Sequence, residues 1–96
     1  MLDVYLGSRH GAPCLQLQER DFAGRWTLVE ALRQCGVAFD FYRDFHIQPA
    51  HAATLARVLD PRLAAPLNQE SPALLALYAL LLRAALEGHT LYFVGD

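Results

Sequence analysis

The chain has 96 residues, of which 54% are hydrophobic and 19% are charged. This length suits one domain that buries about 60–70% of the surface of the unfolded chain, and the composition excludes an intrinsically disordered protein. The formal net charge of −2 excludes a general attraction to nucleic acid or to anionic membranes. We therefore expect no nucleic acid and no membrane among its partners.

The sequence also gives expectations about location and source. The start MLDVYL has no basic region, long apolar region or cleavage site, and the weakly polar run at residues 72–82 is shorter than the ~20 residues of a membrane span. The cysteines, Cys14 and Cys35, are too few for a disulfide framework or a zinc site. All basic residues are arginine, which is typical of a GC-rich bacterial genome. We expect a soluble, cytoplasmic protein with reduced thiols and no cofactor.

The N-terminal segment predicts a β-hairpin. LDVYL at residues 2–6 and CLQLQ at 14–18 both alternate in polarity, which is the pattern of half-buried antiparallel strands. Leu15 and Leu17 are expected to face a core while the intervening glutamines face water. The segment GSRHGAP, residues 7–13, has the glycines and proline of a connecting loop.

A helix that ends at Gly36 is predicted next. Thr27 and Glu30 have the spacing of a capping box, and Trp26 stands where a hydrophobic staple residue would. A start near Asp21 remains an alternative, because apolar residues continue at helical spacing from there. Trp26 is either folded back onto the domain or an exposed anchor for a partner.

The strongest strand pattern is VAFDFYRDF, residues 37–45. Its strict alternation places two sets of side chains on opposite faces: Val37, Phe39 and Phe41 on one, and Ala38, Asp40, Tyr42 and Asp44 on the other. Arg43 falls in phase with the phenylalanines. It therefore marks the end of the strand, or else it points inward and finds a carboxylate.

Two further helices and a strand complete the chain. Pro49 at a first helical turn predicts a helix to about Leu59, where Asp-Pro ends it. Ser-Pro then begins a helix over residues 72–87, and TLYFV at 90–94 predicts the last strand. The order is ββαβααβ, so we expect a single α+β domain over residues 1–96, with a mainly antiparallel sheet of about four strands packed against three helices.

The helix over residues 72–87 carries an unusually wide apolar surface. At about 100° per residue, its leucines and tyrosine cover roughly two-thirds of the circumference, far more than the stripe of a surface helix. So wide an arc requires cover on several sides. The helix is therefore either the central core helix alone, or a core helix that also contacts a partner or a second copy of the chain in a homodimer.

A first candidate site is the acidic-aromatic face of the strand predicted at residues 37–45. Asp40, Tyr42 and Asp44 would stand together there, about 7 Å between alternate residues. Tyrosine offers a large contact area with a polar tip, and aspartates suit a basic partner. With Trp26 as a further anchor, these residues are the predicted partner-binding surface.

A second candidate site surrounds the glycine-flanked loop at residues 7–11. Arg9, His10, Arg43 and His46 are the candidate ligand or anion contacts, and their convergence on one concave site would favour a small ligand-binding domain or enzyme. The loop lacks the phosphate-loop pattern and no helix start follows it.

No motif predicts catalysis or metal binding. His46 and His51 are five residues apart across an element boundary, which is not the spacing that brings two imidazoles to one metal. G-x-S-x-G, H-E-x-x-H, C-x-x-C and G-x-G-x-x-G are all absent. We name no catalytic residue and no metal ligand.

We therefore predict a non-enzymatic protein-interaction module. In size, mild acidity and acidic surface the chain resembles, in general character, small bacterial proteins that neutralise a partner, such as toxin immunity proteins. That resemblance implies an immunity-like or regulatory protein. The alternatives are a small ligand-binding domain or enzyme, and a structural homodimer.

Overall fold

The structure, a computed structural model, describes residues 1–22, 26–37, 39–60 and 72–95, with the side chains of residues 26–28 left out. The described elements are β1 (Leu2–Leu6), β2 (Leu15–Leu17), the 3-10 helix η1 (Glu19–Phe22), α1 (Trp26–Gln34), β3 (Phe45–Ile47), α2 (Pro49–Leu59), α4 (Pro72–Glu87) and β4 (Leu91–Gly95). The predicted α+β class and the order of its strands and helices are confirmed.

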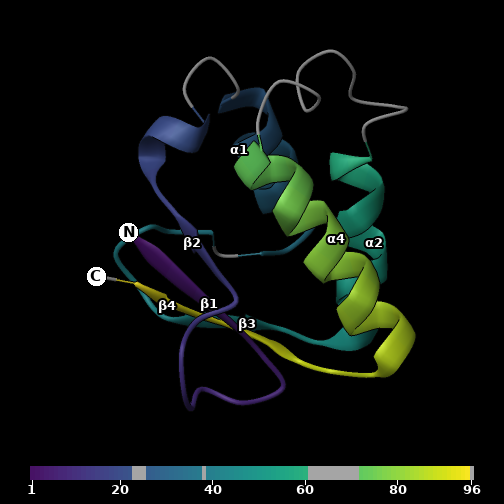
Figure 1. Cartoon of the computed structure of the whole chain (residues 1–96). Helices are drawn as coiled ribbons and strands as arrows, with labels where there is room; N and C mark the ends of the chain where they lie inside the picture. The colour runs from purple at the N-terminus through teal and green to yellow at the C-terminus, as the bar shows by residue number, and fades with distance from the viewer. Residues whose placement is uncertain (23–25, 38, 61–71, 96) are drawn as a thin grey trace.

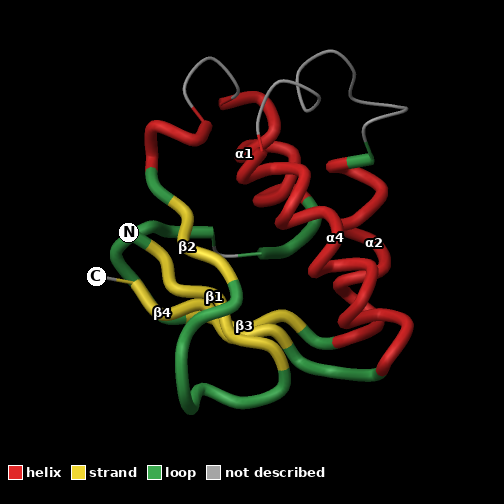
Figure 2. The backbone as a smooth tube through the Cα atoms, viewed as in Figure 1, coloured by secondary structure: helices red, strands yellow, loops and turns green. Residues whose placement is uncertain are grey.

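The four strands form one antiparallel sheet in the order β2-β1-β4-β3. Figures 1 and 2 show α1, α2 and α4 together on one side of this sheet. The strand residues that point toward the helices form the inner face, and they are buried: Leu2, Val4, Leu17, Ile47, Leu91 and Phe93. Because side chains alternate along a strand, the residues between them point to the opposite, outer face.

The predicted N-terminal hairpin is confirmed. β1 pairs with β2 in the register Leu2↔Leu17 and Val4↔Leu15. Leu17 is fully buried and Leu15 is half-buried against the core, while Gln16 between them is exposed. The alternation in the sequence therefore gives the correct face for this strand.

The strand predicted over residues 37–45 is wrong in its extent. β3 begins only at Phe45, and residues 39–44 form no strand: the chain turns at Phe41 and Tyr42 and bends at Arg43. Asp40 Oδ1 accepts a hydrogen bond from the backbone N–H of Tyr42 (2.8 Å). This local side-chain bond offers the backbone a turn in place of a ladder.

Phe39 and Phe41 are buried although they lie outside a strand. Their ring centroids each lie 5.5 Å from that of Phe22 and 5.3 Å from one another, all in edge-to-face contact. Such contacts are among the favoured arrangements of aromatic pairs. The alternation in this segment therefore reports burial in an aromatic cluster and not pairing in a sheet.

The helices begin and end close to the predicted residues. α1 begins at Trp26, one residue before Thr27. The alternative start near Asp21 is not observed, because Asp21 belongs to the separate 3-10 helix η1. Gly36 follows α1 with φ +92°, a conformation in which glycine is strongly favoured as a helix stop. α2 matches its predicted bounds. No helix in the described segments is long and apolar enough to span a membrane.

α4 is the central helix of the core, and its apolar arc is only partly covered. Four residues of this helix are buried in the core: Leu74, Leu77, Leu81 and Ala84. Leu82 is 37% exposed and Leu86 is 86% exposed. The core role of this helix is confirmed, and two leucines near its C-terminal end remain on the surface.

Candidate functional site

The three residues of the predicted acidic-aromatic strand face do not share a strand face. Asp40 and Tyr42 lie in the turn before β3, and Asp44 directly precedes β3. The hydroxyl of Tyr42 donates a hydrogen bond to Glu19 of η1, and Tyr42 is 66% exposed. That bond, followed by the negative charge of Glu19, raises the pKa of Tyr42 above its ordinary value. Tyr42 is therefore an exposed aromatic residue tied to a neighbouring turn.

The charges around this turn largely balance one another. The Arg43 side chain is 84% exposed and its Nε lies 3.7 Å from Asp40 Oδ2. Arg43 therefore points outward, which answers the question left open by its phase with the phenylalanines. The side chain of Trp26, the other predicted partner contact, lies outside the described residues.

A row of aromatic rings crosses the outer face of the sheet. Tyr5 of β1 is the register partner of Tyr92 of β4, and Tyr92 is the register partner of His46 of β3. The ring centroids of His46 and Tyr92 lie 6.3 Å apart. These three residues alternate with the buried inner-face residues, so their rings stand on the side of the sheet without helices (Figure 1).

An ion pair lies against this row. Arg9 of the β1–β2 loop donates from Nη2 to Asp44 Oδ2 (2.7 Å), and its Cζ lies 6.0 Å from the centre of the Tyr92 ring. Asp44 Oδ1 accepts the backbone N–H of Gly95 (3.0 Å). Both oxygens of Asp44 are thereby used to hold the loop and the end of β4 together. We call Tyr5, Arg9, Asp44, His46 and Tyr92 the outer-face cluster.

The structure brings together two of the four candidate ligand contacts. Arg9 and His46 border one hollow of about 140 Å³, together with Asp44, Phe45 and Tyr92. His10 and Arg43 do not border it. His10 has one described hydrogen bond, from its backbone N–H to Ser8 Oγ (3.2 Å).

A second hollow, of about 340 Å³, lies on the other side of β3. Its lining residues are Gly36, Val37, Asp44, Phe45, His46 and His51. His51 Nε2 lies 2.6 Å from the carbonyl oxygen of Cys35, so this imidazole ties the start of α2 to the end of α1. Among the described residues, no three histidine, cysteine, aspartate or glutamate side chains are placed to hold a metal ion.

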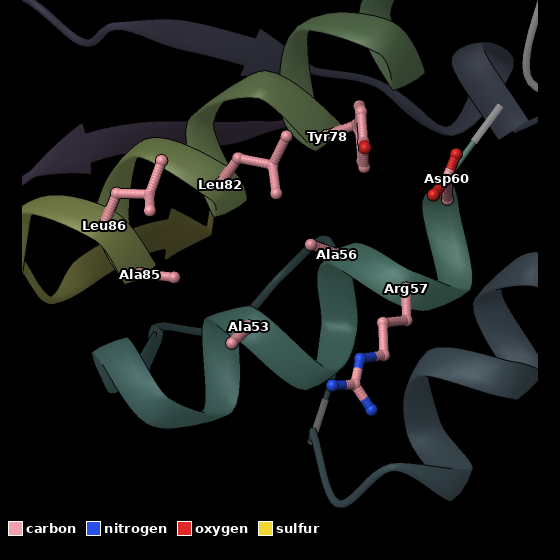
Figure 3. Close-up of a pocket in the computed structure, with 8 residues that line it drawn as sticks. All are labelled: Ala53, Ala56, Arg57, Asp60, Tyr78, Leu82, Ala85 and Leu86. Atoms are coloured by element: carbon pink, nitrogen blue, oxygen red, sulfur yellow. The ribbon is translucent and has the colours of Figure 1, made fainter. Parts of the chain in front are cut away.

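A third concave surface runs between α2 and α4. We call it the α2–α4 groove; its volume is about 310 Å³, and it is lined by Ala53, Ala56, Arg57, Asp60, Tyr78, Leu82, Ala85 and Leu86. Figure 3 shows α2 and α4 side by side along it, with Leu86 toward one end and Asp60 toward the other. The exposed leucines of α4 therefore border a groove whose α2 side carries two alanines, Ala53 and Ala56, beside the charged Arg57 and Asp60.

Sequence reasoning named Arg9, Asp44 and His46 of the outer-face cluster, but it missed Tyr5, Tyr92 and the α2–α4 groove. Tyr5 and Tyr92 had a usable signal, since each alternates with apolar residues inside a predicted strand. The groove had a weaker one, the alanines of α2 at helical spacing.

Comparisons of the chain with protein-family models, curated proteins and solved structures give no match.

Proposed function

We propose that this chain is a non-enzymatic protein-interaction module that docks a partner protein on the outer face of its sheet. The observation that supports the proposal is the outer-face cluster itself. A sheet face without helices carries three aromatic rings in register and an arginine held over one of them. Tyrosine and arginine are enriched among the residues that dominate protein interfaces.

Preorganisation also supports docking at this surface. The guanidinium of Arg9 is fixed by Asp44, and Asp44 is fixed by the backbone of Gly95. Side chains that are already ordered lose less conformational entropy when a partner binds. A partner therefore meets a surface whose polar groups are largely in position.

The hollow beside Arg9 is smaller than the sites that usually enclose drug-sized ligands. The hollow beside Arg9 and Tyr92 holds about 140 Å³. Sites for drug-sized ligands typically enclose about 300–1,000 Å³ and surround the ligand. A shallow depression of this volume suits one side chain that projects from a docked protein.

The charge of the outer face suggests the character of the partner. Asp3 stands on this face beside Gln16, and its Oδ1 accepts a hydrogen bond from the Gln16 amide (3.0 Å). Asp3 and Asp44 each carry a negative charge, and Arg9 carries a positive one. With histidine counted as neutral, the net charge of these residues is about −1. A partner with a basic patch complements it, in keeping with an immunity-like or regulatory protein.

The proposal is tested by capture of partners from a lysate of the source cells with the immobilised chain. A His46→Thr/Tyr92→Thr variant removes two rings and keeps residues that favour strands. We expect it to lose the captured protein while its melting temperature stays close to that of the wild type. Glu30→Ala, on the exposed side of α1, is the matched control. Equal capture by the double variant and the wild type would reject the outer face as the docking surface.

A further inference from the structure

The α2–α4 groove differs from the outer face in what it leaves exposed. Its α4 wall carries Leu82 and Leu86, and Leu86 is the most exposed large apolar residue of the described chain. Burial of these two leucines against a second apolar surface would lower the free energy, because it removes apolar surface from water.

We propose that the α2–α4 groove docks a second copy of this chain, so that two helix pairs close into a four-helix bundle. This goes beyond the partner docking proposed for the outer face, because it uses the opposite side of the molecule and a different chemistry. Two properties of the groove point to this occupant: shape and area.

The shape of the groove is self-complementary. One wall projects Leu82 and Leu86, while the floor and the other wall are lowered by Ala53, Ala56 and Ala85. A two-fold axis that runs along the groove, parallel to both helices, places the α4 leucines of each copy over the α2 alanines of the other. Such an isologous contact repeats every interaction twice and closes the assembly at a dimer.

The area of the contact is that of a weak, reversible interface. With 16 residues, α4 is about 24 Å long, and two helices side by side are about 20 Å wide, so the face covers roughly 500 Å² on each copy. The total, about 1,000 Å², is at the lower limit of specific protein interfaces. We therefore expect a reversible dimer with a dissociation constant on the order of 1–100 μM.

The test is sedimentation of the full chain over a range of concentrations. The wild type should shift from monomer to dimer between about 1 and 500 μM, a range that brackets the expected constant. Leu86→Glu should weaken the dimer at least about tenfold, because a buried carboxylate without a partner is strongly disfavoured. Since Leu86 is exposed in the single chain, the variant should keep the helical circular dichroism of the wild type. Gln34→Glu, on the exposed side of α1, adds the same charge elsewhere and should dimerise as the wild type does.

Two outcomes would overturn the proposal. One is a wild type that stays monomeric at the highest concentration, including the case in which the groove takes an unrelated protein. The other is a Leu86→Glu variant that dimerises as the wild type does.

Discussion

No helix or strand of the described residues covers the outer face of the sheet or the α2–α4 groove, and the two surfaces are built from different chemistry. On the outer face, polar and charged groups satisfy one another: Arg9 bonds to Asp44, and Asp44 bonds to the end of β4. In the groove, Leu82 and Leu86 face water without apolar cover on one side. Because its polar groups are paired with one another, the outer face is stable in contact with water and is suited to reversible recognition. The second gains free energy from any apolar cover, which is why we assign it to self-association.

Both surfaces depend on one core. The inner face of the sheet and the buried sides of α2 and α4 belong to a single cluster of buried residues. A change in that core is therefore expected to affect both surfaces, whereas a change at either surface should leave the other unaffected. Substitutions in the core and at each surface can therefore test whether the two surfaces are independent.

Truncation of a core aromatic residue should damage both surfaces together. Phe93 is fully buried and stacks on Phe45, with centroids 4.5 Å apart and planes 8° from parallel. Phe93→Ala should lower the free energy of unfolding by about 3–5 kcal/mol through lost burial and a cavity. Urea denaturation measures this loss, and partner capture and dimerisation should both decline. A stable variant that loses only one of them would show that the surfaces do not share their support.

Gly95→Ala should disturb the outer face and leave the groove intact. A Cβ at this position would lie 2.6 Å from the carbonyl oxygen of Arg43, too close for any contact, and backbone must move to relieve it. We expect a loss of about 1–3 kcal/mol, together with a displacement of Asp44. Nuclear magnetic resonance shifts should change in the 40–45 segment and at Tyr92, while the α4 signals stay in place. Unchanged shifts near Asp44 would contradict the packing described for the end of β4.

Asp44 is expected to be a structural residue as well as a surface one. Asp44→Ala removes the acceptor of the Gly95 N–H and the partner of Arg9, and should lower the free energy of unfolding by about 1 kcal/mol, because both groups are partly exposed. Asp44→Asn keeps an acceptor and should lose less. Chemical denaturation of the three proteins separates the two contributions. Equal stability of the alanine and asparagine variants would assign the whole effect to the ion pair.

The smallest expected effect is a pH dependence at Tyr42. Because the pKa of Tyr42 is raised in the folded chain, its stabilising contribution is present below about pH 10 and is lost as the pH rises through the folded pKa. The Tyr42→Phe variant should therefore be less stable than the wild type below about pH 10, and this difference in the free energy of unfolding should become smaller at higher pH. The chain has no lysine, so no lysine titration overlaps this range. An ultraviolet titration in which all four tyrosines ionise alike would contradict the contact with Glu19.

The sequence predicts elements well where local chemistry decides them. Pro49 at a first helical turn and Asp60 before a proline mark both ends of α2, and the glycines after α1 and α4 mark their stops. The segment at 37–45 fails because alternation indicates which residues are buried without indicating what the backbone pairs with. Asp40 directs the backbone into a turn, and the phenylalanines reach the core from there.

The candidate sites were less predictable because they depend on contacts across the chain. Arg9 and Asp44 are 35 residues apart in sequence, and only the strand order brings the β1–β2 loop beside β3. In the same way, Leu81 and Leu86 are the same residue type on one helix, yet one is buried and the other exposed. Periodicity places both in the apolar arc, and only the packing of α2 against α4 shows where the cover ends.

The position of β4 also governs the order in which the sheet can assemble. The last described strand lies between β1 and β3, and Leu2 pairs with Gly95 across nearly the whole length of the chain. Until residues 91–95 are available, β1 and β2 form an isolated two-stranded hairpin, and β3 has no neighbour; neither is stable alone. Completion of the sheet therefore closes the longest loop in the molecule, which makes it a late step with a high entropic barrier. Removal of this one short strand would separate β3 from the hairpin and leave no continuous sheet.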